Sequence, residues 1–359
     1  MKRYIAIDNK CLWPNLTVFA DGSIGAVGFN EPCHGTRPGE VQAWISNDGG
    51  RIWTARDYPV PHKEGEVRMN HSAGLGLDGE WLCAVGGYGG WTQSPASEED
   101  VRDYVLTYSD YWDSLSRLTA LVARSYDQGI TWETFAELPH MEGWCPLVPF
   151  GKIQTGNDGR LRMFSYSLRT NRDASTRQAF FLRSRNGGAT WEVQSQLPSS
   201  GTTETAAIHL GNGMWIAAAR RIESYGGEIL IGYRSMDDGE TWTRGEVLGI
   251  RDSFPAWFLM WNDRLLLFHG NRAVGRGGID VRIFDSQHGG WTSPRRLVDL
   301  GGDLGYPSAV VNSAGELVLA YYSSHVPDHQ RYHMGVLITT PDEFGLNDFP
   351  CWAETSHAS

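Results

Sequence analysis

A nine-residue motif recurs along this chain and constrains its fold more than any other feature. "SNDGGRIWT" begins at Ser46, and close copies begin at Ser125, Ser184 and Ser235, each spelling Ser-x-Asp/Asn-x-Gly-x-x-Trp. A shorter, incomplete fifth copy, "SQHGGWT", begins at Ser286. Successive copies are 79, 59, 51 and 51 residues apart. Similarity that returns at such intervals is typical of an array of repeated supersecondary units. The motif is called the box turn.

A second repeated unit surrounds the box turns, in which an apolar run, a short Gly/Asn/Asp turn and another apolar run predict a β-hairpin. The six copies are "PNLTVFADGSIGAVGF" from Pro14, "HSAGLGLDGEWLCAVGG" from His71, "FGKIQTGNDGRLRMFSYS" from Phe150, "ETAAIHLGNGMWIAAAR" from Glu204, "AWFLMWNDRLLLFHG" from Ala256 and "YPSAVVNSAGELVLAYY" from Tyr306. Each hairpin supplies strands A and B of a sheet, and strands C and D flank the box turn.

Six four-stranded antiparallel sheets in series predict an all-β fold, a six-bladed β-propeller. We expect one domain over residues 1–359, with "RYIAI" near the N-terminus closing the last blade so that no sheet edge stays open. Within the box turn, Gly gives backbone freedom, Asp bonds the turn amides, and Trp packs between strands C and D. The box turn is therefore expected to stabilise the fold and not to catalyse a reaction.

Bulk composition narrows the classes of partner. The net charge of −11 argues against nucleic acid or an anionic membrane as a partner. No apolar run is long enough to span a membrane, and no signal peptide is visible, so a cytoplasmic location is expected. A leader removed before Met1 would leave the same pattern. The five cysteines are widely spaced and match neither a disulfide framework nor a zinc site, so no cofactor or metal is predicted. Calcium bound by loop oxygens and the oligomeric state are left open.

The end of the propeller opposite the box turns collects the B–C loops, where function usually lies. These loops are rich in arginine: Arg37, Arg169, Arg172, Arg177, Arg220, Arg221, Arg272, Arg276 and Arg331. Guanidinium groups pair with carboxylates in two-point geometry, so this rim is predicted to bind an anion, although solvated loops also often hold arginine. The long loop of blade 2 predicts a short helix over about residues 94–116, either a lid on the site or a decoration or oligomer contact.

With these motifs the chain resembles the sialidase (neuraminidase) superfamily, six-bladed propellers that carry this box turn. The resemblance covers nearly the whole chain. It implies three arginines that hold a substrate carboxylate, a tyrosine nucleophile assisted by a glutamate, and an aspartate that acts as the acid/base. The matching positions are Glu204 and Arg220 in "ETAAIHLGNGMWIAAAR", Arg276 in "RGGIDVR" and Tyr306 in "LGYPSAVV". Arg272 and His71 are further candidates for substrate binding.

Two positions depart from the family. "LWPNL" has Leu12 where an Arg-Ile-Pro sequence is expected, so Arg37 or Arg68 would have to replace that arginine. The aspartate that serves as the acid/base in the family is also absent. Glu31 or His34 is the candidate acid instead, and Glu31 would need a raised pKa for that role. Each of these residues could instead have a structural role. Tyr306 could be a core aromatic residue, the glutamate and the arginines could form ion pairs, and His71 could be a buried histidine with its hydrogen bonds made inside the protein.

The resemblance implies a glycoside hydrolase that cleaves a terminal acidic sugar, either sialic acid or a related ulosonic or uronic acid. Tyr306 would attack the sugar after giving its proton to Glu204. One alternative is a polysaccharide lyase, in which His34 or His71 acts with Tyr306 on a uronate-containing glycan. Another is a carbohydrate-binding propeller without activity. The expected partner in each case is an acidic carbohydrate.

Overall fold

The computed structural model describes residues 1–32, 39–89, 116–171, 174–223, 227–248, 254–349 and 351–352. His34, Arg37 and nearly all of the helix predicted over residues 94–116 lie outside these ranges. The described chain is built almost wholly of β-strands. Its helical elements are η1 (Ala174–Thr176), α3 (Pro341–Phe344) and η2 (Leu346–Asp348).

The described strands form six antiparallel blades in chain order. Blade 1 contains β2 (Asn15–Val18), β3 (Ile24–Phe29), β4 (Val41–Ser46) and β5 (Thr54–Ala55). Blade 2 contains β6 (Glu66–Leu75), β7 (Trp81–Gly89), β8 (Ser116–Ser125) and β9 (Glu133–Glu137). Blade 3 contains β10 (Val148–Thr155), β11 (Leu161–Ser167), β12 (Gln178–Ser184) and β13 (Glu192–Gln196).

Blade 4 contains β14 (Thr202–His209), β15 (Trp215–Ile222), β16 (Glu228–Ser235) and β17 (Thr243–Val247). Blade 5 contains β18 (Ala256–Trp261), β19 (Arg264–Asn271) and β20 (Gly278–Asp285), with β21 (Gly290–Trp291) and β22 (Arg295–Asp299) both paired to β20. Blade 6 contains β23 (Gly301–Val311), β24 (Leu317–His325), β25 (His333–Thr339) and, from the N-terminus, β1 (Lys2–Asp8).

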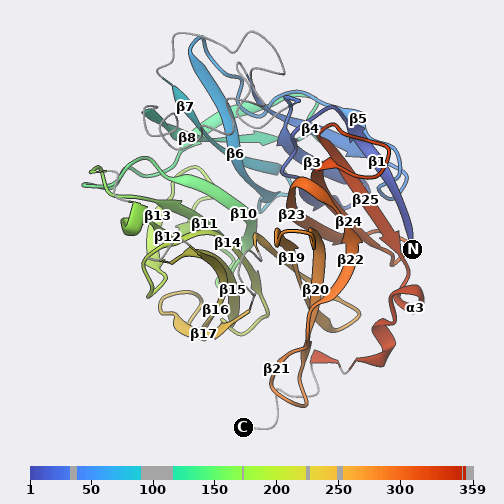
Figure 1. The fold of residues 1–359 in the computed structure, drawn as a ribbon. Coiled ribbons are helices and arrows are strands. Elements are labelled where there is room, and N and C mark those ends of the chain that lie inside the picture. The colour runs from blue at the N-terminus through green and yellow to red at the C-terminus, as the bar shows by residue number, and fades with distance from the viewer. Residues whose placement is uncertain are drawn as a thin grey trace.

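The blades form a closed ring, which confirms the predicted propeller. The first strand of each blade contacts the first strand of the next, from β2 through β6, β10, β14, β18 and β23 and back to β2. Figure 1 shows the sheets arranged around a common centre. The N-terminal strand β1 pairs antiparallel with β25, as expected for ring closure. Blades 2 and 3 are also joined by parallel pairing between their first strands, where Gly151 of β10 pairs with Ser72 of β6.

Each interface between neighbouring blades has its own apolar cluster. Five of these six clusters contain the tryptophan of a box turn, namely Trp53, Trp132, Trp191, Trp242 and Trp291. Trp242 of blade 4 also donates from Nε1 to Ser195 Oγ of blade 3 at 3.1 Å. The tryptophan therefore packs between blades, and the prediction that it fills the space between strands C and D was wrong.

The polar residues of the box turn close the turn on itself, as predicted. In blade 2, Ser125 Oγ donates to Asp127 Oδ1 at 2.8 Å and accepts from the amide of Gly129 at 2.8 Å. Asp127 Oδ1 also accepts from the amide of Thr131 at 2.9 Å. The Ser-to-Gly bond recurs at 2.8–2.9 Å in the turns that begin at Ser46, Ser184 and Ser235. Turn amides that would otherwise lack partners are satisfied inside the motif.

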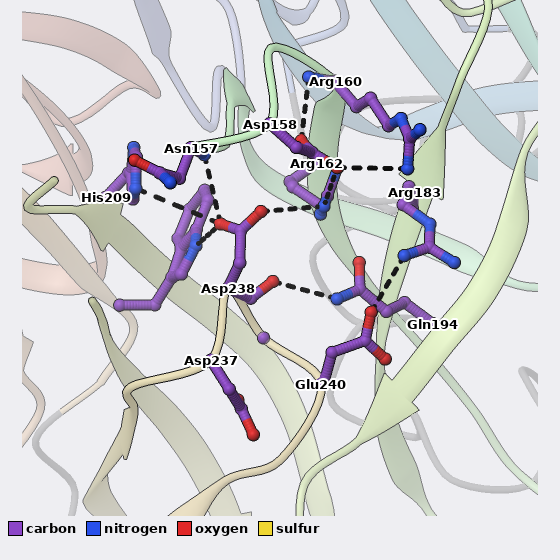
Figure 2. A network of polar contacts seen from close by, with 12 residues as sticks. Asn157, Asp158, Arg160, Arg162, Arg183, Gln194, His209, Asp237, Asp238 and Glu240 are labelled. Carbon is purple, nitrogen blue, oxygen red and sulfur yellow. Dashed lines mark hydrogen bonds and ion pairs between the residues drawn. The ribbon is translucent and has the colours of Figure 1, made fainter. Parts of the chain in front are cut away.

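The fourth box turn also binds the preceding blade (Figure 2). Asp238 has a left-handed backbone (φ 58°), and its carboxylate accepts from Arg162 Nη2 at 3.0 Å and from Trp215 Nε1 at 2.8 Å. Arg162, only 1% exposed, also pairs with Asp158 at 3.0 Å. Buried charges require such pairing because their desolvation is costly. This network holds blades 3 and 4 together at the end opposite the arginine-rich loops.

Candidate active site

Three of the residues assigned by resemblance meet at the other end of the ring, together with Arg272. The Tyr306 hydroxyl donates to Glu204 Oε1. Arg220 Nη1 donates to the second oxygen of the same carboxylate at 2.8 Å. The Arg272 guanidinium carbon lies 5.8 Å from the centre of the Tyr306 ring. Four chemically active groups from blades 4, 5 and 6 are thus within the reach of one sugar ring.

Backbone geometry explains how these side chains converge. Glu204 lies near the start of β14 and Arg220 near the end of β15, so the hairpin places them beside each other across the sheet. Tyr306 lies at a register shift between β23 and β24 and has φ 48°. A positive φ is strained for a bulky residue, and such strain is typically retained at functional sites. The irregularity in β23 turns the phenol out of the alternating pattern and toward Glu204.

Aromatic rings surround Tyr306 and limit its contact with water. The ring centres of Trp13, Phe150 and Tyr322 lie 6.0, 5.9 and 5.6 Å from that of Tyr306. Burial raises the pKa of Tyr306 well above its usual value, and the nearby Glu204 carboxylate raises it further. The guanidinium groups of Arg220 and Arg272 act in the opposite direction. The phenol is therefore protonated at neutral pH and needs a base in direct contact to become a nucleophile.

Arg220 is held by two carboxylates, one of which sequence reasoning missed. Its Nη2 contacts Glu228 Oε1 and Oε2 at 2.7 and 2.9 Å, while Nη1 binds Glu204. Burial opposes the charge on Arg220, but Glu204, Tyr306 and Glu228 outweigh it and raise the pKa of the guanidinium. Both terminal nitrogens of the Arg220 guanidinium therefore already donate hydrogen bonds to protein carboxylates. Only its place at the start of β16, beside the end of β15, could have indicated Glu228.

Arg272, and not Arg276, lies against the tyrosine. Arg272 Nε donates to the carbonyl of Leu304 at 2.9 Å and Nη2 donates to the Tyr322 hydroxyl at 2.9 Å. Neighbouring Tyr322, Asp303 and Tyr306 raise the pKa of Arg272 against the opposing effect of burial. Arg276 is exposed in the turn that follows, and no contact joins its side chain to Tyr306 or Glu204.

Asp303 is a second carboxylate that sequence reasoning missed. It accepts hydrogen bonds from the hydroxyls of Tyr322 at 2.6 Å and Tyr332 at 2.9 Å, and it lies 3.5 Å from Arg272 Nη2. These contacts help to fix the position of Arg272. The tyrosines come from β24 and the loop after it, so no local sequence pattern links them to Asp303.

No cation occupies the position where the family has its first arginine. Leu12 is fully buried in the apolar cluster between blades 1 and 6. A Cβ atom added at Gly28 would approach Leu12 Cδ2 to 2.6 Å, so that side chain is tightly enclosed. Arg68, one candidate replacement, is 5% exposed and binds Glu66 at 3.1 Å and the carbonyl of Thr119 at 3.1 Å. The other candidate, Arg37, lies outside the described residues.

The proposed acid and the candidate histidines are less closely tied to Tyr306. Burial raises the pKa of Glu31, as an acid would require, and its charged neighbours are Lys10, Glu40 and His62. His71 is buried, with Nδ1 3.3 Å from the carbonyl of Met69, and burial lowers its pKa to about 4. His71 and Tyr306 both line a central cavity of about 20 Å³, which has room for about one water molecule. His34 lies outside the described residues.

Among the described residues, no group of three or more His, Cys, Asp or Glu side chains is arranged to hold a metal ion. None of the described helices is long and apolar enough to cross a bilayer.

Comparison with known proteins gives a family and a fold. A model of the BNR repeat-like domain matches residues 105–319, more than half of the chain. No curated protein sequence matches. A protein of unknown function from Dyadobacter fermentans is similar in structure (TM-score 0.77, 22% identity), with 94% of this chain and 97% of that chain covered.

Two sialidase structures are similar over most of this chain. The Hadza microbial sialidase Hz136 has a TM-score of 0.69 at 16% identity, with 92% of this chain and 66% of that chain covered. The NanB sialidase of Streptococcus pneumoniae has a TM-score of 0.65 at 12% identity, with 97% and 70% covered. This chain therefore spans about two thirds of each sialidase. At these identities the likeness establishes the sialidase fold.

Proposed function

This chain belongs to the BNR repeat-like family, and we propose that it is a glycoside hydrolase that removes a terminal acidic sugar from a glycan, with Tyr306 as the nucleophile. The observation that carries the proposal is the hydrogen bond from the Tyr306 hydroxyl to Glu204, with Arg220 holding the same carboxylate. A partly buried phenol with a raised pKa in contact with a fixed carboxylate is the pairing that an activated tyrosine requires.

In the proposed first step, the Tyr306 oxygen attacks the anomeric carbon while Glu204 accepts the phenol proton. A neutral phenol approaches an anionic anomeric centre without the charge repulsion that a carboxylate would meet. As negative charge develops on the phenol oxygen, Arg220 and Arg272 stabilise it. A separate acid protonates the leaving oxygen as its bond to the anomeric carbon breaks, and Glu31, with its raised pKa, is the described candidate. In the second step a water molecule attacks the anomeric carbon and releases Tyr306, which takes its proton back from Glu204.

Arg272 is the candidate to meet the carboxylate of the sugar. It has N–H groups beyond those used by Leu304 and Tyr322, whereas Arg220 is engaged by two protein carboxylates. The fixed position of Arg272 over the Tyr306 ring would place that carboxylate beside the reacting carbon.

The test is a screen with aryl glycosides of sialic, related ulosonic and uronic acids, measuring release of the phenol. Tyr306→Phe and Glu204→Gln are expected to lower kcat by about 10²-fold or more, because each removes a partner in the proton transfer. The exposed Tyr126, changed to Phe, is the matched control and should keep wild-type turnover.

The same screen separates the other functions. A product with a new C=C bond, seen as absorbance near the ultraviolet edge, would show that the protein is a lyase that acts by elimination and not a hydrolase. Binding of acidic sugars that does not change in Tyr306→Phe and Glu204→Gln, without any turnover, would make the protein a binding module.

A further inference from the structure

The fifth box turn departs from the other four in length. Trp291 follows Ser286 by five residues, whereas the tryptophan follows the serine by seven in every other copy. The usual bonds are also replaced, since Asp285 Oδ1 accepts from the amides of Gln287 and His288 at 3.0 and 3.2 Å. Ser286 Oγ donates instead to the carbonyl of Cys351 at 3.1 Å. Blade 5 therefore meets blade 4 through a shortened turn.

A cleft of about 400 Å³ lies where this shortened turn meets blade 4. Phe284, Gly289 and Trp291 line it from blade 5, and the outer strands β16 and β17 line it from blade 4. Gly232 and Gly245, at an irregularity in the pairing of those strands, contribute no side chains to fill the space. In Figure 1, β16 and β17 are labelled at the lower left of the ring and β21 is labelled below them, near the bottom. A volume of this size is in the range of small-molecule sites.

The tryptophan of this turn is also placed differently from its counterpart in blade 4. Trp242 is buried and donates to Ser195 Oγ of the preceding blade. Trp291 is partly exposed, its ring lies 5.4 Å from that of Phe284, and its Nε1 makes no hydrogen bond to any described residue. The cleft thus has an aromatic wall with an available N–H donor, a combination suited to a ligand with both apolar and polar faces.

The charges around the cleft favour an anion although the whole chain is acidic. Arg234, Arg244 and Glu246 line it, and neither arginine forms an ion pair with a described carboxylate. Arg282 is on the same face of β20 as Phe284, because side chains two residues apart share a face. Its Nη1 donates to the carbonyl of Thr292, while its buried Nε has no described partner. Two arginines and one carboxylate therefore line the cleft, and that carboxylate, Glu246, also interacts electrostatically with Arg282.

We propose that the cleft between blades 4 and 5 is a second carbohydrate site that binds an acidic saccharide. The ring of Trp291 packs against a face of the sugar, and Arg234 pairs with the carboxylate. This site has no residue in common with the Tyr306 pocket, and the proposal holds whether or not the protein is a hydrolase.

The proposal is tested by titrating the Glu204→Gln protein, in which we expect turnover to be suppressed, with methyl β-glucuronide, the methyl glycoside of N-acetylneuraminic acid and methyl β-glucoside. The glucuronide and the glucoside differ only at the carboxylate. We expect at least one acidic probe to bind at least about 10-fold more tightly than the glucoside. Trp291→Ala and Arg234→Gln are each expected to weaken that binding about 10-fold or more.

Arg234→Gln is informative even where Trp291→Ala unfolds the chain, because Arg234 is exposed and not part of an apolar cluster. The exposed Arg3, changed to Gln, is the matched control and should leave binding unchanged. Equal binding of glucoside and acidic probes, binding of none of them, or unchanged binding in Arg234→Gln would each overturn the proposal. Loss of hydrolase activity in Tyr306→Phe with retained glucuronide binding is the result expected if both sites exist.

Discussion

Two buried histidines should make this protein lose stability in mild acid. His71 in β6 and His269 in β19 are 6% and 1% exposed, and burial lowers the pKa of each to about 4. In the unfolded chain both would titrate near 6.5. Between pH 6.5 and 4 the unfolded state therefore binds more protons than the folded state. The stabilisation is fully present above pH 6.5 and is lost as the pH falls toward 4.

The size of the effect follows from these pKa values. At pH 5, a shift from 6.5 to about 4 corresponds to about 2 kcal/mol less stability per histidine than at pH 8. The two together amount to about 4 kcal/mol, a large share of the roughly 5–15 kcal/mol that stabilises a typical domain. Asp127 and Asp237 of the box turns have pKa values below 3.8, so they stay ionised at pH 5 and do not contribute to the loss.

The assay is urea unfolding at pH 8 and pH 5 for the wild type, His71→Gln, His269→Gln and the double variant. Each single change should reduce the loss of stability between the two pH values by about 2 kcal/mol, and the double change by about 4. The exposed His140, changed to Gln, controls for the loss of a histidine as such. Comparing differences between pH values removes the packing cost of each substitution. If the double variant loses as much stability at pH 5 as the wild type, the burial argument is refuted.

Two further predictions concern the joints between blades. Arg162→Met should lower the free energy of unfolding by about 3 kcal/mol, because it leaves the paired carboxylates without their cation, and adding Asp238→Asn should recover part of that loss in a double-mutant cycle. Gly74→Ala should lower the urea midpoint clearly, because its new Cβ would lie 2.0 Å from the carbonyl oxygen of Ile153, whereas Gly290→Ala meets no atom within 4 Å and should be nearly neutral.

The blades could be predicted from sequence because their information is local. A hairpin needs two apolar runs and a turn within about 20 residues, and the box turn bonds to itself through residues such as Ser125 and Asp127. Ring closure by the N-terminal strand followed from counting strands in the last blade. Glu204 and Arg220 were also accessible, because they lie at the two ends of one hairpin.

Contacts between distant segments could not be predicted in the same way. Arg272 and Arg276 lie four residues apart in one loop, and the structure brings Arg272 to Tyr306 through Tyr322 and the carbonyl of Leu304. No sequence pattern near the arginines indicates that Tyr322 or Leu304 would contact one of them. The box-turn tryptophans were placed wrongly for the same reason, since the surface that Trp242 packs against belongs to another blade.

The charges at Tyr306 bear on which acidic sugar the proposed hydrolase would take. Arg220 and Arg272 are balanced by Glu204, Glu228 and Asp303 among the described residues, and Leu12 replaces the arginine that the family resemblance implies. Among the described residues, a sugar carboxylate would therefore meet one partly available guanidinium, that of Arg272, instead of three arginines. Binding of the ground state would gain less from the carboxylate, and more of the recognition would come from the rings of Trp13 and Phe150 around the tyrosine. Such a site is less restricted to sialic acid than one with three arginines. In the screen this favours the related ulosonic acids, which also carry the carboxylate on the anomeric carbon.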